Sequence, residues 1–284
     1  MQKLHEEKIL ILAKTYPSLS EKYLETVCTA GVREDGSWIR VYPIKFRQMD
    51  EVKRYHKYQW ISCKVYKPEL KNDPRPESFH IEGGISIVSD VLSTRNSWVE
   101  RRKAVIDQRK VYTNRRELIA AAKGYSSSLA LFKPSRLVGP TVEDDEREWD
   151  PVRLKRALQN AKQLDLFEEA RSQFNIVKKL PYKFHYRVYD DEGALSKHII
   201  LDWELGSLFW GEVKRLGSEK AAVDSVIAKF SEFCNFQKYD TYLYMGTSKE
   251  FQQRKAANPW MIIGVGYFPK INPKTKVEQL SLGL

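Results

Sequence analysis

One order of predicted elements occurs twice along this chain of 284 residues: three short β-strands, a helical stretch, then two more strands. Apolar and polar side chains that alternate with a period of two predict the strands, and apolar residues three and four apart predict the helices. Two copies of this order are typical of a pair of small five-stranded barrels, whose sheet face and loops commonly hold oligonucleotides. The repeat therefore constrains the fold more than any short motif.

The first copy has predicted strands at residues 9–12, 23–32, 38–42, 58–66 and 79–88, and a short helix at 46–54. Between the second and third strands, Asp35-Gly36-Ser37 supplies a turn, because glycine adopts positive φ without strain. The strand that follows, Trp38 to Tyr42, alternates with period two. This pair of strands is therefore predicted to form a hairpin.

The second copy has predicted strands at residues 129–138, 182–188, 198–201, 239–245 and 260–267, and helices at 205–216 and 222–233. Pro134 lies within the first of these strands and predicts an edge strand or a bent one. Asp150-Pro151 predicts a further helix start, since proline suits the first helical position. A helical insertion around residues 150–178 is therefore expected between the first two strands.

A basic segment joins the two copies. Ser97 with Glu100, and Asn114 with Glu117, have the spacing of capping boxes, so a helical connector from about Ser97 to Lys123 is expected. The predicted fold class is α+β and β-dominated, with two five-stranded OB-like barrels joined by a basic helical connector. The division is 1–92 for the first barrel, 93–126 for the connector and 127–284 for the second barrel.

The formal net charge of +11 favours a polyanionic partner, because neutralising phosphates releases counterions and contributes much of nucleic-acid affinity. Residues 91–127 carry 9 Lys and Arg against 3 Asp and Glu, so +6 of the +11 lies there. The connector is therefore a candidate phosphate-binding stripe; the alternative is a solvated linker. Its basic residues include Arg101, Arg102, Lys103, Arg109, Lys110, Arg115 and Arg116.

Aromatic and basic side chains interleave on predicted strand faces, as expected of a platform that stacks bases and holds their backbone. Trp38, Arg40 and Tyr42 share one face of the third strand. On the fourth strand the residues between the core positions Ile61, Cys63 and Val65 are predicted to face outward, namely Tyr58, Trp60, Ser62, Lys64 and Tyr66. The alternative for any single aromatic residue is that it fills a small barrel.

The loops between the fourth and fifth strands, residues 67–78 and 247–259, are also expected to close over a ligand, since loops of this kind bind ligands in such barrels. Basic and amide side chains dominate the second loop. The candidate nucleic-acid-binding residues are Trp38, Arg40, Tyr42, Tyr58, Trp60, Lys64, Arg101, Arg102, Lys103, Arg187, Lys249, Arg254 and Lys255.

Several phrases of the sequence carry a family resemblance. They are Ile11 to Pro17, Glu25 to Gly31, Trp38 to Ile44, Asp73 to Ser78, Asp202-Trp203-Glu204, Asn258-Pro259-Trp260 and Ile262-Ile263-Gly264. These phrases resemble the prokaryotic dual OB-containing domain family over nearly the whole chain. The resemblance implies two OB folds and, through the fold, nucleic-acid binding; it implies no catalytic residues.

The sequence thus predicts a cytoplasmic, non-catalytic protein that binds single-stranded or structured DNA or RNA, without a metal, cofactor or membrane. No run of apolar residues is long enough to cross a bilayer, and the scattered cysteines and histidines lack metal-ligand spacing. One alternative is a protein-interaction module of a prokaryotic defence or mobile-element system. Another is a metal-dependent nuclease that uses Asp202, Glu212 and Lys214, but the helical pattern around Glu212 and Lys214 separates their side chains.

Overall fold

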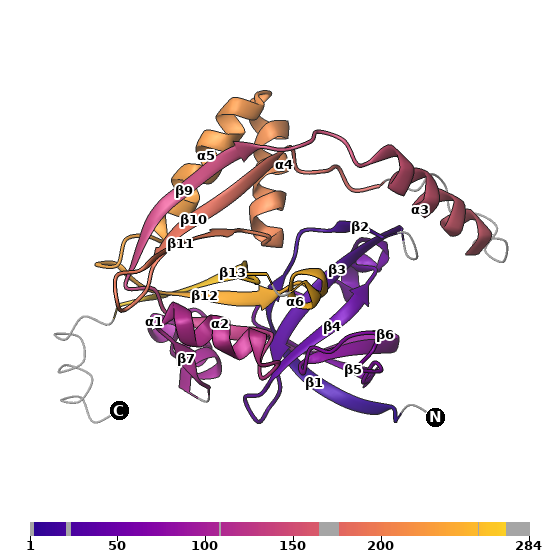
Figure 1. Ribbon diagram of the computed structural model, residues 1–284, viewed down its shortest axis with the longest axis horizontal. Coiled ribbons are helices and arrows are strands. Elements are labelled where there is room, and N and C mark those ends of the chain that lie inside the picture. Colours follow the sequence, from indigo (N-terminus) through magenta and orange to yellow (C-terminus); the bar gives the residue numbers. More distant parts are fainter. Residues whose placement is uncertain (1–2, 21–23, 108, 165–175, 255, 271–284) are drawn as a thin grey trace.

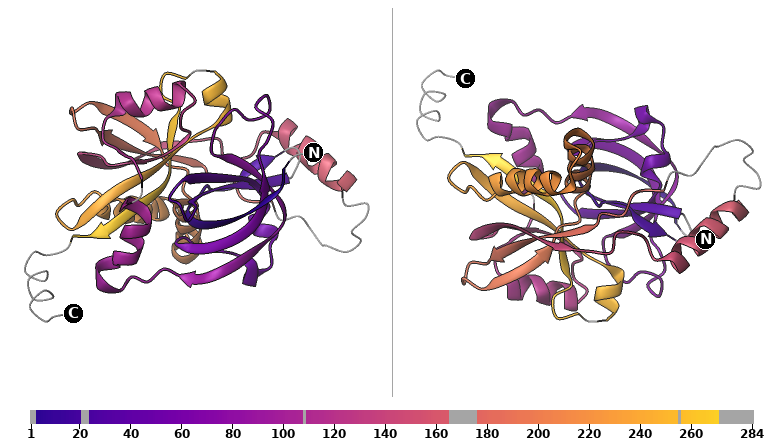
Figure 2. Two further views of the ribbon diagram at one scale, coloured as in Figure 1. Left: turned by 90° about the horizontal axis from the view of Figure 1, so that it is seen from below. Right: turned by 90° about the horizontal axis from the view of Figure 1, so that it is seen from above.

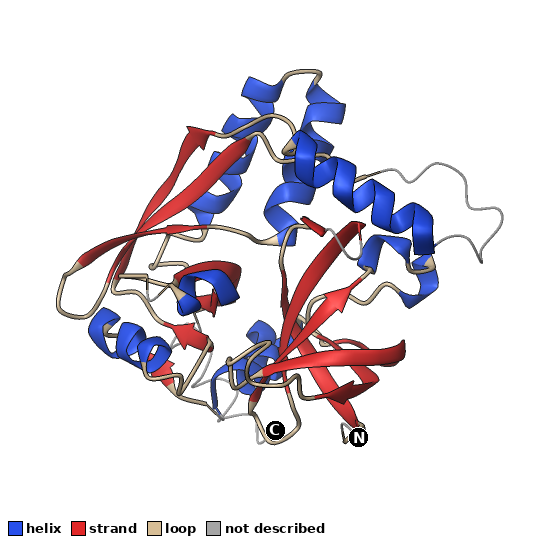
Figure 3. Ribbon diagram, turned by 45° about the vertical axis from the view of Figure 1, so that its right-hand side comes forward, coloured by secondary structure: helices blue, strands red, loops and turns tan. Residues whose placement is uncertain are grey.

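The protein is described here by a computed structural model, which describes residues 3–20, 24–107, 109–164, 176–254 and 256–270. Its strands form two groups, one from each half of the chain, with helices around them (Figures 1 and 3). The predicted class, α+β with strands dominant, is confirmed.

The first group is a closed barrel. Its strands are β1 (His5–Lys14), β3 (Leu24–Val32), β4 (Trp38–Ile44), β5 (Gln59–Tyr66) and β6 (Ser78–Val91). They pair in the order β1-β3-β4-β6-β5 and back to β1, and only β4 with β6 is parallel. This is the Greek-key connectivity of an OB barrel. The short strand β2 (Ser18–Ser20) pairs with the start of β3.

Local sequence accounts for most of this barrel. Ile39 and Val41 on β4, together with Ile61 on β5, are buried in its core, as the period of two predicts. Gly36, at φ 81°, makes the turn between β3 and β4. In place of the expected helix at 46–54, the chain forms two single 3₁₀ turns, η1 (Phe46–Gln48) and η2 (Glu51–Lys53).

The second group repeats the same strand order. Its strands are β8 (Leu129–Phe132), β9 (Arg136–Asp144), β10 (Tyr182–Tyr189), β11 (Leu195–Ile199), β12 (Tyr239–Thr247) and β13 (Trp260–Pro269). Pro134 lies between β8 and β9, so the predicted bent strand is confirmed as two segments. β9 pairs with β10 and β10 with β11, while β8 pairs with β12 and β12 with β13. A parallel bridge from Ile200 to Ile262 joins the two sheets.

Helices α4 (Trp203–Leu216) and α5 (Glu219–Glu232) follow the third strand of the second barrel and pack on its core. Asp202 caps α4 and Ser218 caps α5, because each side chain accepts a hydrogen bond from a free backbone amide. The insertion begins as predicted with α3 (Pro151–Leu164); residues 165–175 of the expected range lie outside the described residues. α3 reaches the first barrel, where Ala157 packs against Leu19 and Leu24 (Figure 1).

The connector is largely helical, as predicted, but its helices are not continuous. It consists of α1 (Arg95–Arg102), a π-helical turn η3 (Lys103–Asp107), the strand β7 (Val111–Tyr112) and α2 (Arg115–Lys123). Pairing of β7 with β8 interrupts the helix, and this contact is not encoded locally. Asn114 caps α2 as predicted, whereas Ser97 has positive φ and does not cap a helix.

The two barrels pack against each other through a shared apolar cluster. Leu10 and Leu12 of β1 meet Leu131 of β8, Tyr244 of β12 and Ile263 of β13. Seen from below and above, the two halves of the chain lie side by side (Figure 2). The barrels therefore form one unit with a buried interface. Among the described residues, no helix is both long enough and apolar enough to cross a membrane.

Two glycines of α4 have different surroundings, and they test the packing of this helix against Tyr16, which follows β1. A Cβ atom on Gly206 would lie 2.1 Å from Cδ2 of Tyr16, whereas a Cβ on Gly211 would meet no atom within 4 Å. We expect Gly206→Ala to lower the free energy of unfolding by about 1–3 kcal/mol, as overpacked sites do. The control Gly211→Ala should raise it by up to about 1 kcal/mol through helix propensity. Urea unfolding of both variants measures the difference, and equal stabilities would contradict the predicted contact.

Candidate nucleic-acid interface

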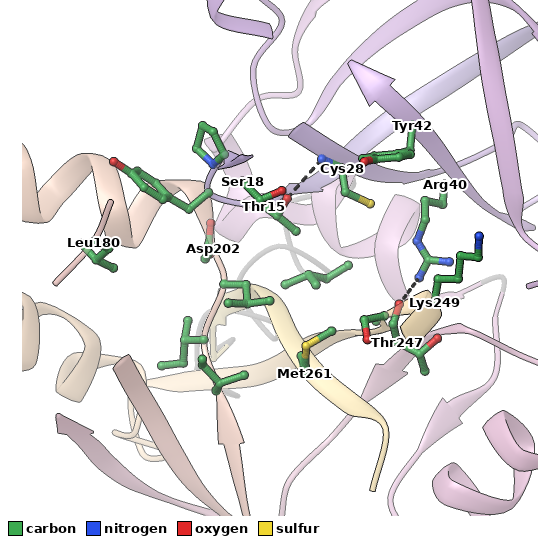
Figure 4. Close-up of a pocket in the computed structure, with 18 of the residues that line it drawn as sticks. Thr15, Ser18, Cys28, Arg40, Tyr42, Leu180, Asp202, Thr247, Lys249 and Met261 are labelled. Carbon is green, nitrogen blue, oxygen red and sulfur yellow. Dashed lines mark hydrogen bonds between the residues drawn. The ribbon is translucent and has the colours of Figure 1, made fainter. Parts of the chain in front are cut away.

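A cleft of about 880 Å³ lies between the two barrels (Figure 4). In each barrel, the loop after the first strand and the loop between the fourth and fifth strands contribute to its lining. The first barrel supplies residues 15–18 and Asn72, Asp73 and Arg75; the second supplies Asp145, Trp149, Lys179 and Leu180, and then residues 246–249. These are the loops that bind ligands in OB folds, so both sets converge on one cleft.

Aromatic side chains line the cleft on both sides. Tyr16 and Tyr42 come from the first barrel, and Trp149 and Tyr182 from the second. The hydroxyl of Tyr16 donates to the carbonyl oxygen of Lys178 at 2.9 Å, and Nε1 of Trp149 donates to that of Val177 at 2.9 Å, so both rings are held in place. The remaining lining is largely apolar and includes Ile199, Ile200, Leu201, Leu205, Met261 and Ile263.

Cationic side chains lie along the same lining. Nζ of Lys179 lies 2.8 Å from one carboxylate oxygen of Asp145, and Nζ of Lys183 lies 2.7 Å from the other. Partial burial favours protonated Asp145, but the two lysines hold the pKa of its carboxyl at about 2. Lys249, at the start of α6 (Lys249–Gln253), is exposed and forms no ion pair with any described residue. Asp145 is thus paired with two lysines, and Lys249 adds a third lysine to the lining.

At one side of the cleft a buried arginine joins the barrels. The guanidinium of Arg40 donates to the carbonyl oxygen and to Oγ of Ser128, both at 2.8 Å. Nη1 of Arg75 donates to the carbonyl oxygen of Thr247 at 2.9 Å. Burial, and then the neighbouring Arg75, lower the pKa of Arg40 to about 10, so its guanidinium remains charged at neutral pH.

On the side opposite Arg40, Asp202 belongs to a buried ionic cluster (Figure 4). Burial raises the pKa of its carboxyl to about 7, although Lys57 opposes this shift. Nζ of Lys57 forms an ion pair with Glu204 at 3.1 Å, and the charge of Lys57 is the main cause that lowers the pKa of Glu204. Burial also lowers the pKa of Lys14 to about 8. Asp202 is therefore the carboxyl of the cluster that loses its proton only as pH rises toward neutral.

Three of the predicted stacking residues are buried or half-buried. Tyr58 is buried and its hydroxyl lies 3.1 Å from that of Tyr244, while Trp38 and Trp60 pack against the inter-barrel cluster. The prediction of an exposed ring is wrong for Tyr58, and Trp38 and Trp60 are exposed only in part, because the second barrel and the connector pack against that face. Of the predicted aromatic residues, Tyr42 lies in the cleft.

The predicted cations that the structure describes divide into three groups: one is buried, two are engaged in contacts within the protein, and the others are exposed. Arg40 is 2% exposed, so the prediction of an outward-facing guanidinium is wrong; its donors are used between the barrels. Arg101 and Arg102 are also engaged: Nε of Arg101 donates to the carbonyl oxygen of Leu92 at 2.8 Å, and Arg102 forms an ion pair with Asp240 at 2.7 Å.

The third group is exposed. Lys64, Lys103 and Arg187 are exposed but lie outside the cleft lining, and Arg254 pairs with Glu250 at 2.8 Å. Lys249 is exposed and lines the cleft. Lys255 lies outside the described residues. The structure therefore brings Arg40, Tyr42 and Lys249 together at one site and leaves the other described candidates elsewhere.

Sequence reasoning missed several cleft residues, chiefly Tyr16, Trp149 and Lys179. Each lies in a loop between the first and second strands of its barrel and follows no periodic pattern. The only signal that could have found them was their position in the strand order, since such loops bind ligands in OB folds.

The residues of the nuclease alternative do not assemble. Glu212 lies on α4, as its helical pattern predicts, and pairs with Arg215 and with Ser225 at 2.9 Å. Asp202 caps the other end of the same helix. Within the described ranges, no group of three or more His, Cys, Asp or Glu residues is placed to hold a metal ion.

Comparisons with known proteins place the chain in a family without an assigned activity. A family defined as a domain of unknown function, DUF8757, matches residues 112–282, and the chain belongs to it; a second domain of unknown function, DUF8758, matches residues 5–107. A search of curated protein sequences finds no match.

Two solved structures show a distant similarity. One is described as a murine DNA-binding protein bound to double-stranded DNA: identity is 10%, the TM-score is 0.28, and the match covers 94% of this chain and 97% of that one. The other is a replication protein A heterotrimer bound to single-stranded DNA: identity is 10%, the TM-score is 0.25, and the match covers 99% and 69%. TM-scores below 0.5 do not establish a shared fold, so the barrel assignment depends on the strand pairing.

The raised pKa of Asp202 predicts a dependence of stability on pH. A carboxyl whose pKa rises on folding binds its proton more tightly in the folded state, so its stabilising contribution is lost as pH rises from about 4 to about 7. Asp202→Asn keeps a capping side chain and removes the charge. We therefore expect it to gain stability relative to the wild type as pH rises from 5 to 8, by an amount on the order of a few kcal/mol.

The measurement is chemical unfolding at both pH values. Asp224→Asn is the control, because Asp224 is exposed and forms a surface ion pair with Lys220. Its effect on stability should be small at both values. A difference between the Asp202→Asn variant and the wild type that stays constant with pH would contradict the assignment.

Proposed function

We propose that this protein binds a single-stranded or structured nucleic acid in the cleft between its two barrels, without cutting it. One observation carries the proposal: the ligand-binding loops of both barrels line the same cleft. A purely structural role for the two barrels would not require these loops to face each other.

The side chains of the cleft suit this ligand. Bases stack on aromatic rings whatever their sequence, and the rings of Tyr16, Tyr42, Trp149 and Tyr182 are available from both walls. Lysines neutralise phosphates, and Lys179, Lys183 and Lys249 lie at the same lining. An apolar floor with cations beside it favours bases that point inward and a backbone that follows the lysines.

The size of the cleft supports an unpaired strand. At about 880 Å³ it lies within the range of small-molecule pockets, roughly 300–1,000 Å³, and so has room for a short run of nucleotides. In a duplex the bases are stacked and paired in the interior, out of reach of rings inside such a cleft. We therefore infer that a duplex binds less tightly than a single strand of the same sequence.

The finer assignments follow from this proposal. Whether the ligand is DNA or RNA is a property for the binding assay to establish, and a protein partner is the alternative occupant of the cleft. The division into residues 1–92, 93–126 and 127–284 and the likeness to the prokaryotic dual OB-containing domain family stay predictions, supported by the repeated strand order. A cytoplasmic location also stays a prediction.

Two basic residues of β10 test the cleft against the exposed strand face. Lys183 lines the cleft, whereas Arg187, one of the sequence-predicted contacts, is exposed on the same strand outside it. We expect Lys183→Ala to weaken binding of a single-stranded oligonucleotide about three- to tenfold. It should also reduce the slope of log K against log salt by about 0.7, since one phosphate contact is lost. Arg187→Ala should change neither quantity.

Fluorescence anisotropy at two salt concentrations, with single- and double-stranded DNA and RNA, measures both effects. A loss on Arg187→Ala without one on Lys183→Ala would move the interface to the exposed face of the second barrel. No salt-dependent binding of any of the four nucleic acids would rule out the proposed function and favour a protein partner, whose aromatic-anchored contact falls little with salt.

A further inference from the structure

One side of the cleft is closed by hydrogen bonds between the barrels. The backbone carbonyl of Thr247, at the end of β12, accepts from Arg75 at 2.9 Å and from Arg40 at 3.4 Å. Ser128, just before β8, accepts from Arg40 and donates its backbone N–H to the Glu77 carboxylate at 3.0 Å. Segments of both barrels meet here, so a bound strand has no path through this side.

The same side carries more cations than carboxylates: Arg40, Arg75 and Lys249 lie there with the carboxylates of Asp73 and Glu77. The guanidinium of Arg40 is buried, and its hydrogen-bond partners are hydroxyl and carbonyl groups; it forms no ion pair with a described residue. The nearby carboxylate of Asp73 is held by Arg75 at 2.7 Å. Lys249 adds a second cation without an ion pair among the described residues. Glu77 and Asp73 therefore compensate the buried charge of Arg40 only in part and without direct contact, and a bound anion would add to that compensation.

Tyr42 completes the set of donors. Its hydroxyl oxygen accepts a hydrogen bond from Oγ1 of Thr26 at 3.2 Å, which leaves its own proton for another acceptor. Figure 4 shows Tyr42, Arg40 and Lys249 on one side of the cleft and Asp202 and Leu180 on the other. A phenol, an ammonium and the field of a guanidinium together suit a phosphate.

From this arrangement we propose that the closed side of the cleft, at Tyr42, Arg40 and Lys249, is a subsite for a phosphate monoester on a nucleoside, namely the terminal phosphate of a bound strand. The subsite rests on the proposed function. A terminal group fits because the side is closed, and a monoester fits because it carries a charge of about −1.5 to −2 at neutral pH, opposite two cations. Lys249 and Tyr42 contact the phosphate, and Arg40 acts through its field.

The test compares single-stranded oligothymidylates of about 12 nucleotides, within the site sizes of OB folds. They carry a 5′-phosphate, a 3′-phosphate or neither, and a fluorophore at an unphosphorylated end. We expect one of the two phosphates to strengthen binding about tenfold. Lys249→Ala should reduce that ratio to below about twofold. Because the ratio compares strands on the same variant, a backbone contact that Lys249 makes with every strand cancels from it. Tyr42→Phe, which keeps the ring, should reduce the ratio in part.

Lys64→Ala is the control, since Lys64 is exposed and lies outside the cleft lining; it should leave the ratio unchanged. Thymidine 5′- and 3′-monophosphates, added as competitors of the labelled strand, show whether the subsite also binds a free nucleotide. Displacement by one of them, but not by thymidine, supports the subsite. Equal binding of all three strands by the wild type would overturn the subsite and leave the proposed function standing. No binding of any strand would overturn the proposed function itself.

Discussion

The arrangement of the two barrels depends on one buried guanidinium, that of Arg40. It donates to Ser128 and Thr247 of the second barrel and to Ser78 of its own. A planar group with five donors can reach acceptors on several segments at once, which an ammonium group cannot do in fixed geometry. Its desolvation is offset only when all of these segments are in place, so we infer that Arg40 selects one docking of the barrels.

The apolar contact between the barrels stabilises their association but does little to fix their relative orientation. Leu10, Leu12, Leu131 and Ile263 gain from burial in many relative orientations, because the hydrophobic effect scales with area. Directional groups are needed to choose among them, and the interface contains the joint at Arg40 and the pair of hydroxyls of Tyr58 and Tyr244. In the orientation that results, the loops that correspond to the ligand-binding loops of other OB folds face each other, and the cleft lies between them.

Much of the fold could be predicted because it is encoded locally. Period-two alternation placed Ile39 and Val41 in the core, Pro134 marked the bend of a strand, and Asn114 and Asp202 cap the helices that follow them. Each of these signals concerns residues within a few positions of one another.

The site was harder to predict, because it depends on contacts between distant residues. Arg40 and Ser128 are 88 positions apart, and Arg40 and Thr247 are 207 apart. Alternation on a strand shows which side chains share a face, but not what covers that face. Trp38 and Trp60 were assigned correctly to the side opposite the core of the first barrel, and the second barrel and the connector then cover that side.

The connector arginines show that a positive charge can act in two ways: by direct contact with a phosphate, or through its long-range field. The net charge of the chain does not distinguish the two. The guanidinium of Arg101 lies 4.6 Å from the ring centre of Tyr58, and that of Arg109 lies 5.6 Å from the ring centre of Trp38. Arg109 also donates to the carbonyl oxygens of Ala104 and Val105. Donors engaged in this way are not free to bind a phosphate, but their charge still contributes to the long-range field that attracts a polyanion. The excess of +11 therefore contributes to the long-range attraction of a polyanion, while under the proposed function direct contact with a phosphate falls to the cations that line the cleft.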